Sequence, residues 1–115
     1  MSNLFKTVSK VSILFIEKVI PVLKMDLRYE KNILFINLEG TLNRGTSYKI
    51  NNFLIPSILK HRIKYGILNI KSLREIDEDG IDSLLNIKSS FKNNKGLLLL
   101  HETNDEIIKV LINFI

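Results

Sequence analysis

The chain has 115 residues, of which 45% are hydrophobic and 25% charged, and it contains no cysteine. This composition indicates one soluble globular domain and excludes disulfides, thiol nucleophiles and cysteine-ligated zinc. The net charge is +5, but four lysines against one glutamate place +3 of it in residues 1–24 and leave +2 for the other 91. The lysines of those 91 residues are scattered, without an arginine-rich face or stacking aromatics, so nucleic acid is not an expected partner.

The first segment, residues 3–23, has the pattern of an amphipathic helix. Apolar residues recur at steps of three and four: Leu4, Val8, Val11, Phe15, Val19 and Leu23. Charged residues interrupt the segment too often for a membrane span, which needs about 20 largely apolar residues. Its longest charge-free run, Val11 to Ile16, is too short for a secretory signal. Two interpretations remain: a helix that binds a membrane surface or a partner, and a helix that packs on its own domain or extends a chain that naturally starts at Met25.

From Met25 the pattern is that of a β-hairpin. Asp26 to Tyr29 alternates as a short strand, and Glu30 to Asn32 is a turn. Ile33 to Leu38 is a second strand, which we expect to pair antiparallel with the first. Glu39 to Asn43 ends that strand.

A helix is predicted over residues 45–64, with its buried side formed by Ile50, Phe53, Leu54, Ile58 and His61. Pro56 conflicts with a continuous helix, because proline lacks the N–H that the helical hydrogen bond needs, so we expect a kink or a break there with Pro56 opening the second half. Gly66 is expected to end the helix, and a third strand follows at residues 67–70.

The last part of the chain continues the alternation of strand and helix. An amphipathic helix covers residues 81–91 and stops at Asn93 to Gly96. The run Leu97 to Leu100 predicts a central strand buried on both faces, and Asn104 or Asp105 starts a final helix. The order from Met25 is β-β-α-β-α-β-α, which predicts an α/β fold with a mixed, mostly parallel sheet covered by helices.

The most distinctive local feature is the acidic run Asp77-Glu78-Asp79, which follows the third strand and precedes a helix. Three interpretations are open: a partner-contact surface with fixed negative charge, plain capping of the helix, and a magnesium, calcium or receiver-like site. The chain has no phosphate-binding Gly-x-x-x-x-Gly-Lys loop and no Gly-x-Ser-x-Gly elbow. We therefore assign no catalytic residue, metal site, cofactor or small-molecule substrate.

Four segments carry a resemblance to a known family. Leu38 to Asn43 is similar to a strand that ends in Gly-x-Leu-Asp, and Ile76 to Ile81 is similar to Asp-Ser-Ser/Thr-Gly-Leu. Gly96 to Leu100 matches a strand of the Gly-x-Leu-x-Leu type, and Val110-Leu111 stands in the closing helix. In this order and spacing, residues 25–115 resemble the STAS domain, the fold of bacterial anti-sigma factor antagonists.

The resemblance implies a partner-switching mechanism with one alteration. In that family the serine after the aspartate is phosphorylated by an anti-sigma factor that is also a serine kinase. The unmodified antagonist binds that partner, and the phosphorylated form releases it. In this chain Glu78 stands at the phosphoacceptor position and Asp79 at the next hydroxyl position, while Asn43 and Asn69 stand where aspartates are common.

The expected function is regulation by protein–protein contact in the cytoplasm, with an anti-sigma factor or a related serine kinase as the partner. Residues 1–24 would form a helical extension and residues 25–115 the domain. The expected contact residues are Thr41, Asn43, Asp77, Glu78, Asp79, Gly80, Asp82 and Ser83. The alternative is an accessory domain of a transport or lipid pathway, peripheral to the membrane and anchored by residues 3–23.

Overall fold

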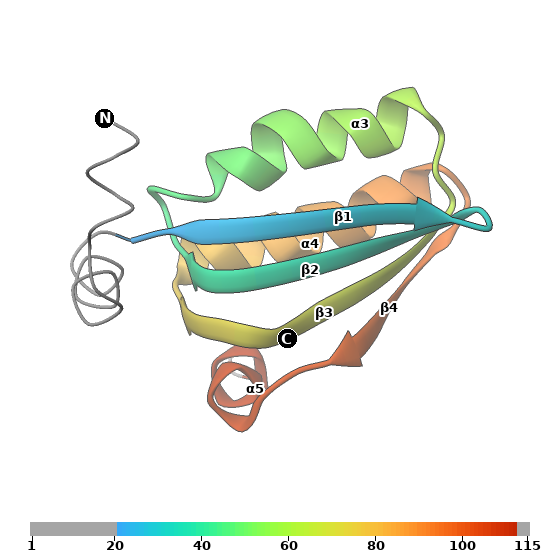
Figure 1. Cartoon of the computed structure of the whole chain (residues 1–115). Coiled ribbons are helices and arrows are strands. Elements are labelled where there is room, and N and C mark those ends of the chain that lie inside the picture. The colour runs from blue at the N-terminus through green and yellow to red at the C-terminus, as the bar shows by residue number, and fades with distance from the viewer. Residues whose placement is uncertain (1–20, 113–115) are drawn as a thin grey trace, which may run out of the picture.

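The computed structural model describes residues 21–112, with side chains up to Lys109. The elements follow one another in the predicted order (Figure 1): β1 (Leu23–Glu30), β2 (Ile33–Leu42), the π-helical turn η1 (Ile50–Leu54), α3 (Ile55–Lys60), β3 (Tyr65–Ile76), α4 (Glu78–Asn93), β4 (Leu97–Glu102) and α5 (Asp105–Ile112). The expected α/β fold is therefore confirmed for the part of the chain described.

The four strands form one sheet in the order β1-β2-β3-β4. β1 pairs antiparallel with β2, and the other two pairs are parallel, so the sheet is mixed and mostly parallel, as predicted. Lys31 and Asn32 both have positive φ, at 53° and 67°, and make the two-residue turn whose twist suits a hairpin between β1 and β2.

The prediction that Leu97–Leu100 forms a central strand buried on both faces is wrong. β4 lies at an edge of the sheet, and Leu97 and Leu99 are 55% and 53% exposed. An uninterrupted apolar run shows that both faces of a strand are apolar. It does not show whether a further strand pairs beside it, because pairing depends on segments distant in the sequence.

Two glycines were misread as ends of elements. β2 continues past Gly40 to Leu42, and Gly40 itself adopts a φ of +99° where the register with β3 shifts. A Cβ there would lie 2.2 Å from the carbonyl oxygen of Val22. Gly66 lies inside β3, where the ring of Phe91 fills the space that a side chain would occupy.

No break occurs at Pro56, because helical backbone continues from η1 into α3: Leu54 and Ile55, where the two meet, both have right-handed helical dihedral angles. The expectation that Pro56 stands at the opening of the second half is confirmed. η1 ends one residue before α3 begins, Pro56 is at the second position of α3, and the Ile55 N–H donates to the Ile50 carbonyl in a wide π-helical turn. The extra residue in that turn changes the phase of the apolar face. As a result Phe53 is 60% exposed and His61 is exposed, contrary to the expectation that both face the core.

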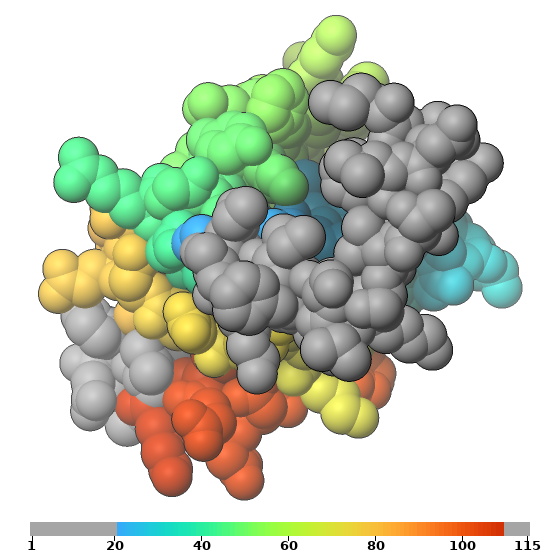
Figure 2. All heavy atoms as spheres, turned by 60° about the vertical axis from the view of Figure 1, so that its left-hand side comes forward, coloured from blue at the N-terminus to red at the C-terminus, as the bar shows by residue number. Residues whose placement is uncertain are grey.

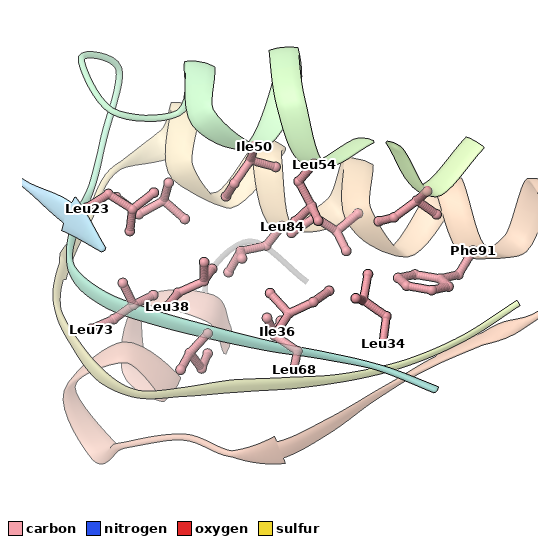
Figure 3. Packing of buried hydrophobic residues seen from close by; sticks show 14 of the residues in the cluster. Leu23, Leu34, Ile36, Leu38, Ile50, Leu54, Leu68, Leu73, Leu84 and Phe91 are labelled. Atoms are coloured by element: carbon pink, nitrogen blue, oxygen red, sulfur yellow. The ribbon is translucent and has the colours of Figure 1, made fainter. Parts of the chain in front are cut away.

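The core lies between one face of the sheet and the helices η1, α3 and α4 (Figure 3). Inward side chains of β2 alternate along the strand, at Leu34, Ile36 and Leu38, and meet Ile50 and Leu54 from the helical side. α5 packs beside β3 past the end of β4. There the Asn104 side-chain amide donates to the carbonyls of Lys71 and Leu73 at 2.9 Å each, and its oxygen accepts from the N–H of Ile107.

The predicted amphipathic helix falls almost entirely outside the described residues. Only its last three residues are described. Residues 21 and 22 are not helical, and Leu23 opens β1 with its side chain fully buried in the core. A helix reaching residue 23 is therefore wrong, while the helix over the earlier residues stays a prediction. Within residues 21–112, no helix has both the length and the apolar character that a membrane crossing requires.

Candidate partner-binding surface

The candidate site lies where two neighbouring parallel strands end. Leu42 at the end of β2 is in register with Ile76 at the end of β3, so the chain leaves both strands at the same edge. This edge is where ligands and partners meet α/β sheets. Figure 2 looks toward this end of the molecule and shows the loop after β2, in green, beside the start of α4, in yellow and orange.

The loop after β2, residues 43–47, is held by its own polar side chains. The Asn43 side-chain oxygen accepts from the N–H groups of Gly45 and Thr46, at 2.9 and 3.1 Å. The Thr46 hydroxyl donates to the Thr41 carbonyl at 2.8 Å and accepts from the Asn43 N–H at 3.0 Å. Asx turns of this kind fix a loop without a hydrophobic core beneath it.

Asp77 joins this loop to α4. One of its carboxylate oxygens accepts from the N–H of Gly80 at 2.8 Å, which caps the helix. The other accepts from the N–H of Arg44 at 3.1 Å, across 33 residues of sequence. The same carboxylate therefore caps the helix and fixes the position of the loop, and capping alone does not describe its role.

Gly80 lets the first turn of α4 lie directly on the end of β2. A Cβ at this position would be 2.3 Å from the Leu42 carbonyl oxygen and 2.8 Å from Cγ1 of Ile76. The first contact is with a backbone atom, so it cannot be relieved without a shift of the backbone. A glycine is required here because the helix start and the end of β2 approach so closely.

Six of the eight predicted contact residues divide into two groups in the structure; the other two, Asp77 and Asn43, make the hydrogen bonds described above. Glu78, Asp79 and Asp82 are exposed, and among the described residues no hydrogen bond or ion pair engages their carboxylates. Thr41, Gly80 and Ser83 are buried, and the Ser83 hydroxyl donates to the Asp79 carbonyl at 3.1 Å. The first group can touch a partner, and the second supports the shape of the surface.

One neighbouring feature was missed from the sequence. A hollow of about 470 Å³ adjoins the start of β1 and is bordered by Lys24, Glu39, Lys49 and Arg74. The Lys49 ammonium donates to the carbonyl of Leu23 at 2.6 Å and so ties the first turn of the helical segment to β1. The residues gather from four separate segments, and no local pattern in the sequence marks them.

The carboxylates of the surface do not converge on one point. Within residues 21–112, no three side chains of the His, Cys, Asp and Glu types converge as metal ligands would. The three exposed acids instead stand on the first two turns of a helix whose N-terminus favours negative charge. What the geometry provides is a rigid negative surface with a loop alongside.

Comparison with known proteins gives a consistent result. Residues 24–114 match the STAS domain family. A structure of the anti-sigma factor antagonist SpoIIAA in its unphosphorylated form superposes with a TM-score of 0.64, at 18% identity, over 77% of this chain and 80% of that one. SpoIIAA of Bacillus in the phosphorylated form gives 0.57, at 12% identity, over 79% and 99%. The antisigma-factor antagonist STAS domain from Rhodobacter sphaeroides gives 0.50, at 11% identity, over 69% and 85%.

Proposed function

The chain belongs to the STAS domain family, and on that premise we propose that it is a regulatory protein-binding domain of the anti-sigma factor antagonist type. The observation that carries the proposal is the surface built by the loop at residues 43–47 and the start of α4. Asp77 locks the two together, so three exposed acids are held on a rigid frame. Charge placed in this way selects a partner and fixes its orientation.

The partner proposed is an anti-sigma factor or a related serine kinase. Glu78, Asp79 and Asp82 would contact it directly, and Asn43 would border the contact. Thr41, Gly80 and Ser83 would act through the frame, because their side chains or Cα positions are buried. This division refines the set of contact residues expected from the sequence.

Glu78 gives the proposed switch a particular form. By the resemblance in the motif it stands where the family has its phosphoacceptor serine. A carboxylate cannot be phosphorylated by a serine kinase, yet it already carries negative charge in the first turn of a helix. The domain is then either fixed in a phosphorylated-like state or has lost the switch.

Mass spectrometry tests the absence of a switch. The full chain is incubated with ATP and the anti-sigma factor kinases encoded in the same genome. We expect no added phosphate on the native chain, because no exposed hydroxyl stands at residues 77–83, and we expect phosphate on Glu78→Ser. Glu106→Ser is the matched control, since Glu106 is also an exposed acid in the first turn of a helix. Phosphate on the native chain near residue 78 would contradict the proposal.

The membrane-anchored alternative depends on residues 3–23, of which only the last three are described. Leu23 is committed to the core, so an anchor would have to end before it. Peripheral attachment through the earlier residues stays a prediction. The vesicle measurement described in the next subsection separates it from an intramolecular role.

A further inference from the structure

The face of the sheet away from α3 and α4 carries six apolar side chains in two rows. Register across the parallel strands aligns Ile33 with Tyr65 and Leu97 in one row, and Phe35 with Ile67 and Leu99 in the next. We call these six residues the open-face rows. Tyr65, Leu97 and Leu99 are each at least half exposed. A contiguous apolar patch of this kind on a globular domain marks a surface that something covers.

No helix among the described residues covers the rows; the one side chain seen over them is that of Arg28 in β1, whose guanidinium carbon lies 4.4 Å from the centroid of the Phe35 ring. η1, α3 and α4 pack on the opposite face, where the core lies. Asn104, directly before α5, donates to the carbonyls of Ile70 and Leu73, which lie beyond Asn69, the last residue of β3 paired with β4. Two shallow hollows of about 370 Å³ each adjoin the rows and share Ile67 in their linings.

The N-terminal segment of the chain also has an apolar face. Residues 1–20 lie outside the described part, and their sequence carries the apolar stripe Leu4, Val8, Val11, Phe15 and Val19 at helical spacing. At 100° per residue, Lys6, Lys10 and Glu17 fall opposite this stripe. The segment joins β1 at Leu23, which is in register with Gly40, at the end of the sheet distant from the Lys31-Asn32 turn.

The lengths agree. A helix preceding β1 must run antiparallel to it if Ile20 to Val22 turns the chain back, and Pro21 favours such a turn. From Val19 to Leu4 such a helix spans about 22 Å, at 1.5 Å per residue. From Gly40 to Ile33 β2 spans about 23 Å, at 3.3 Å per residue. Leu4 would then reach the row of Ile33, and Val8, about 16 Å from Val19, would reach the row of Phe35.

We propose that residues 3–19 form a helix whose apolar stripe packs on the open-face rows of its own domain. This inference goes beyond the proposed function and does not depend on the partner surface. One contact removes two apolar surfaces from water, the rows and the part of the stripe that reaches them, Leu4 and Val8. Insertion of the stripe into a membrane, or pairing of the rows with a second copy, would remove only one of the two.

Cysteine cross-linking tests the proposal cleanly, because the native chain has no cysteine. In the full chain, Val8→Cys with Ile67→Cys is expected to form a disulfide under mild oxidation, within one molecule and at a rate independent of protein concentration. Two control pairs each move one of the thiols. Lys10→Cys with Ile67→Cys moves the N-terminal thiol to the side opposite the stripe, and Val8→Cys with Lys88→Cys moves the other thiol to an exposed position of α4. Both control pairs are expected to stay reduced.

Each other occupant of the rows gives a different result. Disulfide-linked dimers that increase with concentration would mean that a second copy covers the rows, and would overturn the proposal. Equal cross-linking in all three pairs would overturn it as well. Pelleting of the full chain with phosphatidylglycerol–phosphatidylcholine vesicles, abolished by Val8→Asp, would assign the stripe to a membrane. Urea unfolding gives a second measurement: Val8→Asp should lower the midpoint and Lys10→Asp should not, and equal midpoints would contradict the packing.

Discussion

Replacing Gly80 by alanine probes the contact on which the candidate surface is built. The added Cβ would lie 2.3 Å from the Leu42 carbonyl oxygen and 2.8 Å from Ile76 Cγ1. Because the Leu42 oxygen belongs to the backbone, it cannot rotate away. The first turn of α4 must therefore move off the end of β2.

The size of the effect follows from three contributions. Overpacking costs about 1–3 kcal/mol. Weakening of the Asp77–Gly80 capping bond adds about 1 kcal/mol. The better helix propensity of alanine returns about 1 kcal/mol. The expected net loss is about 2 kcal/mol in the free energy of unfolding, or about 8 °C in Tm at about 4 °C per kcal/mol for a domain of this size.

Urea denaturation followed by circular dichroism measures this loss, and the chain supplies its own control. A Cβ on Gly45 in the neighbouring loop would meet nothing closer than Asn43 Oδ1 at 3.4 Å, so Gly45→Ala should change stability by less than about 0.5 kcal/mol. If Gly80→Ala unfolds at the same denaturant concentration as the native chain, α4 does not start on the end of β2 and the geometry of the surface is wrong.

Two further predictions concern the link made by Asp77 and the packing of Gly66 in the core. Asp77→Ala should lower the free energy of unfolding by about 1–2 kcal/mol and speed hydrogen exchange at the N–H groups of Arg44 and Gly80, since it removes the acceptor of both; unchanged exchange at Arg44 would show that the loop is held without Asp77. Gly66→Ala should lower the free energy of unfolding by about 1–3 kcal/mol, because its Cβ would lie 2.4 Å from the Phe91 ring. In a double-mutant cycle the same substitution should cost less when Phe91 is already replaced by leucine. Equal costs in the two backgrounds would refute the contact.

Much of the fold was predictable because its signals are local. The hairpin turn, the position of Pro56 at the start of α3 and the final helix starting after Asn104 each depend on residues close together in the sequence. β4 was misplaced because its four leucines indicate apolar surroundings without saying what supplies them. Gly66 was misread for a similar reason: the ring that takes the place of its side chain comes from Phe91, on another element.

The candidate site was predictable in composition and less so in geometry. The acidic run and its helix start are visible in the sequence, and so is Asp77 as a cap. The bond from Arg44 to Asp77 spans 33 residues and required the register of β2 with β3. The burial of Ser83 follows from its place on the inward side of α4, which separates it from the exposed acids that alternate with it.

The most direct test of the proposed function is the affinity for an anti-sigma factor. Isothermal titration against the purified anti-sigma factors of the same genome would compare the native chain with two double variants. Glu78→Ala with Asp79→Ala removes the acids of the first turn of α4, and Asp105→Ala with Glu106→Ala removes the matched pair in α5.

We expect one such anti-sigma factor to bind. The α4 variant should raise Kd by about tenfold or more, equivalent to about 1.4 kcal/mol, and the α5 variant should leave Kd unchanged. Binding that is lost equally in both variants, or in neither, would contradict a contact through the start of α4. Absence of binding to every anti-sigma factor tested would contradict the proposed function itself.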